Sequence, residues 1–182
     1  MSTRPATYTP PATITQAIVS LSGAYEPDVT VVHARTTDAR ITLTLGGILM
    51  VFYNCAAVQG LRAAFTAAKQ HSALIPEQIP TPQQHMEGNR ITMSIDWTRA
   101  PNYAVVAQSG VNKLRSTTLR WIDVYTAAIT WQIRDRVALN TVLDAVAALH
   151  TVAIATFLDG DEHSADPEHP TRWLASQAQG AR

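Results

Sequence analysis

Basic and aromatic side chains are concentrated between residues 88 and 136 of this 182-residue chain. Within that region, the segment GVNKLRSTTLRW (110–121) carries three basic residues and no acidic residue. The candidate contacts to a nucleic acid are Arg90, Arg99, Lys113, Arg115, Arg120, Trp121, Tyr125 and Arg134. Aromatic rings stack on bases and cationic side chains bind phosphates, a combination typical of sequence-tolerant single-strand binders. The predicted chemistry is binding of single-stranded DNA or RNA.

The charge of this region differs from the charge of the whole chain. Residues 88–136 hold seven basic and three acidic residues, a surplus of four, whereas the chain has 14 Lys plus Arg and 14 Asp plus Glu. A balanced chain produces no global field that attracts nucleic acid or membrane. The alternative for this region is a solvated hairpin with core aromatics. Alternation places Trp121 and Tyr125 on one face and Ile122 and Val124 on the other, so some aromatics must be exposed or lie at an interface.

Residue types that support catalysis are present, but their spacing matches no catalytic motif. The chain has no Gly-x-Ser-x-Gly, no phosphate-binding loop and no His-Glu pair at metal spacing. Asp123 and Asp135 are candidate general bases without an identifiable partner. His33 and His150 are more typical of satisfied core or surface histidines than of catalysts. We therefore expect no enzyme activity and no cofactor.

The single cysteine, Cys55, excludes an internal disulfide and a cysteine-based zinc site. It lies at a predicted turn from strand to helix, where a helix N-terminus can lower the pKa of a thiol and favour a nucleophile. The alternative, which we prefer, is a small buried apolar side chain.

The segment after Leu158 is acidic and resembles a metal site in composition. Its candidate ligands are Asp159, Asp161, Glu162, His163, Asp166, Glu168 and His169. The Asp-x-Asp start lacks the glycine and the distal glutamate of an EF-hand loop, so we expect no metal. Residues 159–182 are expected to form a solvated acidic tail, mobile or with a short docking helix around Trp173 and Leu174. A further hypothesis is that these acids mimic a nucleic acid and contact the basic residues of region 88–136 in the free protein.

The hydrophobic pattern predicts the same order of elements twice. Strands are expected within 17–23, 28–36, 40–45 and 48–53, and again within 90–97, 102–110, 119–125 and 128–135. A helix capped by Asn54 follows the first set, and a helix beginning near Arg136 follows the second. The prediction is an α+β fold of two pseudo-symmetric ββββα repeats, with antiparallel sheets packed together with their helices. Because each sheet has an apolar face, the two units must cover each other, or each must lend its helix to its neighbour.

Apolar positions in the two halves repeat at fixed separations. Val19, Leu21, Pro27, Val31 and Val32 precede Met93, Ile95, Pro101, Val105 and Val106 by 74 positions. Leu49, Val51 and Tyr53 precede Ile129, Trp131 and Ile133 by 80 positions. Val58, Leu61 and Phe65 precede Leu139, Val142 and Val146 by 81 positions. These registers predict an internal duplication with a longer hairpin loop in the second copy.

The chain is expected to divide into five segments. These are a flexible N-terminus (1–12), a first repeat (13–75), a proline-rich linker (76–88), a second repeat (89–158) and the acidic tail (159–182). The N-terminus lacks the apolar segment of a signal peptide. The longest apolar run, Val142 to Leu158, is interrupted by Asp144 and His150 and is too short for a membrane span. We expect a soluble, cytoplasmic protein without membrane contact.

The duplicated unit of four strands and a helix resembles the Whirly class of single-stranded DNA-binding proteins. The resemblance covers residues 13 to 158 and is one of element order. It implies two motifs packed as a pseudo-twofold pair, with single strands held along the exposed sheet surfaces. The strand–helix ending of each half also resembles small actinobacterial domains found on mobile elements.

The alternative function is a structural or protein-interaction subunit of a phage or mobile element. Charge neutrality, alanine-rich helices and a strand that is apolar on both faces, residues 48–53, favour a chain that buries a partner surface. The expected partner is then another protein or a second copy of the chain.

Overall fold

The computed structural model describes residues 15–80, 93–112 and 116–168. In chain order, these residues form β1 (Ala17–Leu21), β2 (Asp28–Val32), β3 (Arg40–Leu45), β4 (Ile48–Phe52), α1 (Cys55–Ala68), the 3₁₀ helix η1 (Lys69–Leu74), β5 (Met93–Trp97), β6 (Tyr103–Asn112), β7 (Thr117–Thr126), β8 (Ile129–Ile133) and α2 (Arg136–Thr156). The predicted order, four strands and a helix occurring twice, is confirmed for these residues.

The strands form two four-stranded mixed sheets, and each half of the chain gives its first strand to the sheet of the other half. Sheet A has the order β1-β8-β7-β6, and sheet B has the order β2-β3-β4-β5. β1 runs parallel to β8, and β5 runs parallel to β4, whereas the remaining neighbours are antiparallel. The expectation of antiparallel sheets is therefore wrong. Long connections separate β1 from β8 and β4 from β5, so no tight hairpin imposes the antiparallel direction.

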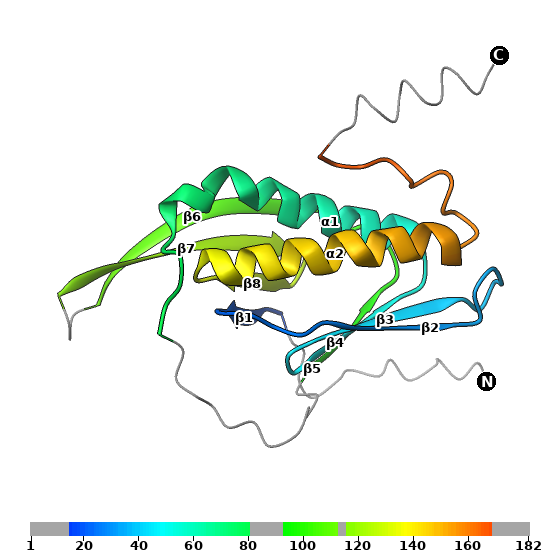
Figure 1. The fold of residues 1–182 in the computed structure, drawn as a ribbon, viewed down its shortest axis with the longest axis horizontal. Coiled ribbons are helices and arrows are strands. Elements are labelled where there is room, and N and C mark those ends of the chain that lie inside the picture. The colour runs from blue at the N-terminus through cyan, green and yellow to red at the C-terminus, as the bar shows by residue number, and fades with distance from the viewer. Residues whose placement is uncertain (1–14, 81–92, 113–115, 169–182) are drawn as a thin grey trace, which may run out of the picture.

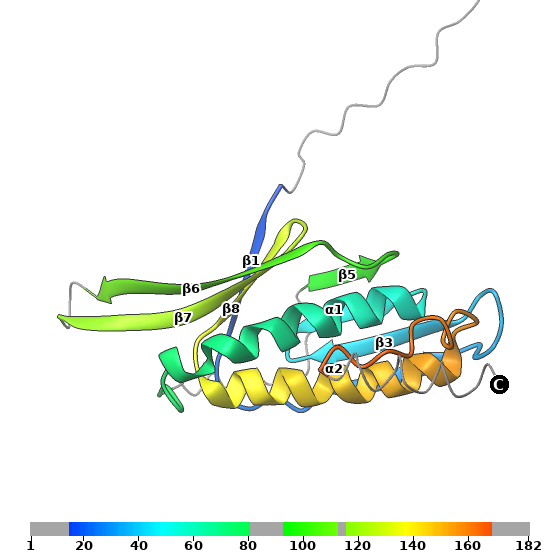
Figure 2. The same cartoon turned by 90° about the horizontal axis from the view of Figure 1, so that it is seen from above.

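The two helices run side by side in opposite directions (Figures 1 and 2). α1 contacts β6 and β7 of sheet A as well as β4 of sheet B, and α2 contacts β3 of sheet B as well as β8 of sheet A. Each helix thus packs against the sheet of the other half. Of the two arrangements expected from the apolar sheet faces, the structure therefore has the one in which each unit lends its helix to its neighbour.

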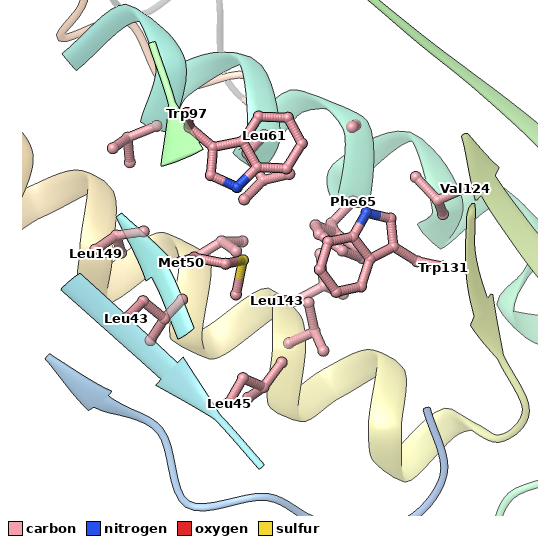
Figure 3. Packing of buried hydrophobic residues seen from close by; sticks show 14 of the residues in the cluster. Leu43, Leu45, Met50, Leu61, Phe65, Trp97, Val124, Trp131, Leu143 and Leu149 are labelled. Atoms are coloured by element: carbon pink, nitrogen blue, oxygen red, sulfur yellow. The ribbon is translucent and has the colours of Figure 1, made fainter. Parts of the chain in front are cut away.

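One core joins both sheets and both helices (Figure 3). Its labelled members are Leu43, Leu45, Met50 and Trp97 of sheet B, Leu61 and Phe65 of α1, Val124 and Trp131 of sheet A, and Leu143 and Leu149 of α2. Trp131 packs edge-on against Phe65, with ring centroids 5.7 Å apart, and its Nε1 donates to Thr126 Oγ1 at 2.8 Å. Because the halves share this core, neither half has a complete core of its own.

The structural register confirms the helix separation of 81 positions. All six residues at that separation, Val58, Leu61, Phe65, Leu139, Val142 and Val146, are buried. The helix caps keep the same separation, because Asn54 accepts a hydrogen bond from the backbone N–H of Ala57 and Asp135 accepts one from Ala138. The helices of the two halves therefore occupy corresponding positions.

The separations predicted for the strands are wrong. β4 and β8 begin at Ile48 and Ile129, which makes the separation 81 and not 80. The one-residue slip reverses the face, since Trp131 is buried toward the helices while Val51 is only half-buried. β4 is apolar on both faces, so alternation could not fix its register.

The first strands are offset by a different amount. β1 and β5 end at Leu21 and Trp97, a separation of 76 and not 74. Pairing gives the same value for the second strands, since Val29 lies opposite Leu43 and Val105 lies opposite Val124. This slip of two residues leaves each side chain on the predicted face, because faces repeat every two residues.

Among the described residues, one helix, α2, has the length and the apolar composition that would allow it to cross a membrane. Ten of its residues are buried. A helix that is apolar around most of its circumference is expected where it packs against another helix and two sheets. The packing in the core therefore accounts for the composition of α2.

Candidate functional site

The face of sheet A that points away from the helices carries aromatic, amide and charged side chains. In β7, Ile122 and Val124 are buried toward the helices, so Trp121, Asp123 and Tyr125 point outward. The pairing of β7 with β6 and β8 brings further outward residues beside them. We call the resulting set the aromatic–arginine cluster: Gln108, Trp121, Asp123, Tyr125, Gln132 and Arg134.

The indole of Trp121 is held by its two neighbouring strands. The guanidinium carbon of Arg134 lies 5.2 Å from the centroid of the Trp121 ring, a cation–π contact. On the other side, a Cβ atom at Gly110 would lie only 3.3 Å from Cη2 of the indole. Glycine at this position therefore lets the ring lie close to the backbone of β6.

Asp123 lies between the two aromatic residues of the cluster, and its residue is only 5% exposed. Trp121 Nε1 donates to Asp123 Oδ1 at 3.0 Å, and the hydroxyl of Tyr125 donates to Oδ2 at 3.3 Å. Hydrogen bonds of this kind offset the cost of burying a carboxylate. Asp123 thus orients both rings.

Of the eight predicted contact residues, three lie in the cluster: Trp121, Tyr125 and Arg134. Arg120 is exposed on β7 but shares the helix-side face with Ile122, because successive side chains of a strand alternate between faces. Arg99 is exposed in the connection after β5, which belongs to sheet B. Arg90, Lys113 and Arg115 lie outside the described residues.

Sequence reasoning did not assign Gln108 and Gln132 to the site. Strand pairing places Gln108 opposite Trp121 and Gln132 opposite Asp123. Alternation within β6 and β8 predicts that both amides point away from the core. Only the pairing of the strands shows that they flank the aromatic residues.

Exposed apolar side chains surround the cluster on the same face. Ile18 of β1 is 60% exposed, Val106 of β6 is 42% exposed and Leu119 of β7 is 38% exposed. No helix of the described residues covers them. The outer face of sheet A is therefore an open surface that combines aliphatic, aromatic and polar groups.

Cys55 is buried at the start of α1. Burial, and after it the negative charge of Asp159, raises the pKa of the thiol to about 12. Asp159 accepts hydrogen bonds from the backbone N–H groups of Cys55 at 2.9 Å and Ala56 at 3.1 Å. The positive end of the helix dipole is thus already paired with a carboxylate. The thiol is a buried core side chain, and the hypothesis of a reactive nucleophile is wrong.

Residues 159–168, which we call the C-terminal segment, dock along α1. Arg62 forms a salt bridge with Asp166 at 2.6 Å, and Lys69 forms one with Glu168 at 3.0 Å. Gln59 Nε2 also donates to the carbonyl oxygen of Ala165 at 3.0 Å. The expectation of a solvated tail is wrong for these residues, because α1 presents cations and an amide that the acidic pattern alone did not reveal. Residues 169–182, including His169, Trp173 and Leu174, lie outside the described residues.

His150 links α2 to α1 and to the C-terminal segment. The residue is 1% exposed. Arg62 Nη1 donates a hydrogen bond to Nδ1 of His150 at 2.9 Å, so in the neutral ring the proton is on Nε2. Nε2 then donates to the carbonyl oxygen of His163 at 2.8 Å. Burial lowers the pKa of His150, the hydrogen bond to His163 raises it by less, and the charge of Arg62 lowers it further. The interpretation of His150 as a satisfied core histidine is confirmed.

The other candidate histidine, His33, is exposed in the turn after β2.

Asp135 is fully buried and serves as the N-cap of α2. Its carboxylate accepts hydrogen bonds from the backbone N–H groups of Ala138 at 2.8 Å, Gly23 at 3.0 Å and Ile79 at 3.2 Å. The residue therefore ties the end of β1 and the chain after η1 to the start of α2.

A groove of about 320 Å³, with four alanines among its nine lining residues, lies between α1, Ala100 and the C-terminal segment. The polar groups that line it include His163 and Asp166, which already bond to Gln59 and Arg62. Across the described parts of the chain, no three His, Cys, Asp or Glu side chains gather to hold a metal ion.

No protein-family model, no curated protein and no solved structure matches this chain.

Proposed function

We propose that this protein is a non-enzymatic, cytoplasmic module that binds single-stranded DNA or RNA on the outer face of sheet A. One observation supports this most directly: the Arg134 guanidinium lies over the Trp121 indole on an open sheet face. Such a pair offers a base an aromatic surface and offers the adjacent phosphate a cation. Each stacked base contributes roughly 1–3 kcal/mol to binding.

The remaining members of the cluster fit the same role. Asp123 fixes the rings of Trp121 and Tyr125 before a ligand arrives, which lowers the entropy lost on binding. Gln108 and Gln132 carry amides that both donate and accept hydrogen bonds at base edges. With Arg134 as the described cation of the cluster, stacking contributes more to affinity than counterion release does.

We further propose that the chain is a duplicated, pseudo-symmetric pair of ββββα units, as in the Whirly-like arrangement that the sequence resembles. Support comes from the corresponding strand orders of the two sheets and from the helices that are 81 positions apart. In this arrangement the exchange of β1 and β5 obeys the same pseudo-twofold relation as the rest of the fold.

Fluorescence anisotropy with a labelled single-stranded oligonucleotide, at low and high salt, tests the proposed function. Trp121→Ala should weaken binding roughly 5- to 150-fold, the equivalent of one lost stacking contact. Arg134→Ala should weaken binding and reduce the slope of log K against log salt by about one. Tyr53→Ala, which removes an exposed aromatic residue next to sheet B, is the matched control and should leave affinity unchanged.

Absence of binding by the wild-type chain at low salt would contradict the proposal. Equal affinity of the wild-type protein and Trp121→Ala would place the binding surface elsewhere. Thermal unfolding of each variant, followed by circular dichroism, separates loss of binding from loss of folding.

A second candidate function, a structural or protein-interaction subunit, is favoured by the exposed aliphatic residues Ile18, Val106 and Leu119 around the cluster. Native mass spectrometry of the purified protein distinguishes the two functions. Co-purifying nucleic acid supports the first, and a protein complex free of nucleic acid supports the second.

A further inference from the structure

The strand β6 forms one edge of sheet A and lacks the features that normally protect an edge. It has ten residues, and β7 is its only strand neighbour in the described part of the chain. Its sequence, YAVVAQSGVN, contains no charged residue and no proline. The other edge strands, β1, β2 and β5, have five residues each. Short length, charge and proline are the usual protections against pairing with another chain.

β6 also exposes large apolar side chains. Tyr103 is 46% exposed, Val106 is 42% exposed and Val111 is 70% exposed. Val106 lies on the outer face, whereas Tyr103 and Val111 share the helix-side face with Val105. Apolar groups along both faces of an open edge are expected where the strand pairs with a partner.

We propose that β6 pairs in the antiparallel direction with β6 of a second copy of this chain, about a twofold axis at Ala107. In one continuous sheet, residues that lie opposite each other point to the same face. Along β6, residues on the same face are all odd-numbered or all even-numbered. Two opposite residues on the two copies of β6 therefore have numbers whose sum is even, and the residue at half that sum lies opposite its own copy on the twofold axis. For a strand from Tyr103 to Asn112, the longest pairings of this kind centre on Ala107 or on Gln108.

The Ala107 axis is favoured by the side chains that it brings together. It places Tyr103 of each copy opposite Val111 of the other, so the most exposed apolar side chains of the strand cover each other. Aromatic and β-branched residues are favourable cross-strand partners. The strand carries no charge, so the twofold axis brings no like charges together. The interface is self-complementary, as a closed dimer requires.

This dimer goes beyond the proposed function and does not depend on it. Two copies of sheet A would form one continuous sheet, in which β1-β8-β7-β6 of one copy is followed by β6-β7-β8-β1 of the other. Both aromatic–arginine clusters would then lie on the same outer face, so a single strand long enough to span them would gain from simultaneous binding.

Sedimentation velocity over a range of concentrations tests the pairing. The wild-type chain of 19.8 kDa should reach twice that mass, and Val106→Lys should shift the dimer to monomer at the same concentration. Val32→Lys, an equally exposed valine on the outer face of the edge strand β2, is the control and should leave the dimer intact. A wild-type chain that stays monomeric throughout, or a Val106→Lys dimer of unchanged strength, overturns the proposal.

Disulfide trapping tests the axis itself, because the one native cysteine, Cys55, is buried. Residues directly opposite in an antiparallel pair have Cα atoms ~4.5–5.5 Å apart, within the range of a disulfide. Ala107→Cys should therefore form a covalent dimer under mild oxidation. In Gln108→Cys the two thiols are diagonal neighbours, with Cα atoms roughly 7–8 Å apart, and should not crosslink. A crosslink at position 108 alone, or at neither position, overturns the Ala107 axis.

Discussion

Sheets A and B have corresponding strand orders but different outer faces. At the 81-position separation, Trp121 corresponds to Arg40 and Arg134 corresponds to Tyr53, so the aromatic residue and the arginine are exchanged between the two sheets. A cation–π contact joins Arg134 to Trp121 in sheet A. Between them, Asp123 and Tyr125 of sheet A replace two threonines of sheet B, Thr42 and Thr44. On the inner faces, the corresponding residues Ile41 and Ile122 are both fully buried and aliphatic.

The difference shows which positions the fold itself constrains. Inner positions must fill a shared core, so neighbouring side chains must fit each other. Trp131 lies at the position that corresponds to Met50, and Thr126, at the position that corresponds to Leu45, accepts the indole N–H. Outer positions carry no such requirement and are available for binding. The outer face of sheet A, which carries the aromatic–arginine cluster, is the face to which we assign function.

The largest effect is expected from the corresponding core positions Phe65 and Val146. Phe65→Ala should reduce the free energy of unfolding by about 3–5 kcal/mol, because it leaves a cavity beside Trp131. Val146→Ala should cost less, since it removes fewer atoms. Chemical denaturation measures both. One cooperative transition is expected in each variant because the halves share strands, and two separate transitions would contradict the shared core.

The two helix caps should differ in importance. Asp135→Ala should reduce the free energy of unfolding by about 2–4 kcal/mol, because it removes the acceptor of the buried N–H groups of Gly23 and Ala138. Asn54→Ala should cost about 1 kcal/mol, since Asp159 still accepts from the first turn of α1. Urea denaturation gives both values, and Asp135→Asn serves as the conservative control. Equal losses for the two alanine variants would show that Asp135 acts only as a cap.

The corresponding helix positions His150 and Lys69 should differ in pH dependence. Burial lowers the pKa of His150 in the folded protein below the ordinary value of 6.5. Between the two pKa values the unfolded chain binds the extra proton, so stability rises with pH by at most about 1.4 kcal/mol per unit. This contribution is fully present above about pH 6.5 and is lost as pH falls through the folded pKa.

Denaturation curves measured from neutral to acidic pH check this dependence. His150→Gln should flatten the dependence below neutrality, and Lys69→Gln should leave it unchanged. If the pH profiles of the wild-type protein and His150→Gln are parallel, other groups are responsible for the dependence.

The smallest effect concerns the outer faces themselves. Tyr125→Phe removes one hydrogen bond to the buried Asp123 and should cost about 1 kcal/mol of unfolding free energy. Thr44→Val at the corresponding position of sheet B should be close to neutral. Urea denaturation of the two variants side by side measures the difference, and a neutral Tyr125→Phe would mean that Asp123 does not depend on this donor.

Local patterns in the sequence determined the elements and the faces of the strands. Alternation in β7 correctly placed Trp121 and Tyr125 on one face of the strand and Ile122 and Val124 on the other. The helical spacing correctly predicted which residues of α1 and α2 are buried. These predictions succeed because side-chain direction depends on the period of the backbone, which is a local property.

Tertiary structure decided which elements meet. The exchange of β1 and β5, the docking of residues 159–168 on α1 and the grouping of Arg134 with Trp121 all join residues far apart in the chain, or on different strands. Alternation says that a side chain leaves one face of its strand, but it does not say which strand lies next to it. That choice depends on the burial of the shared core, to which both halves contribute.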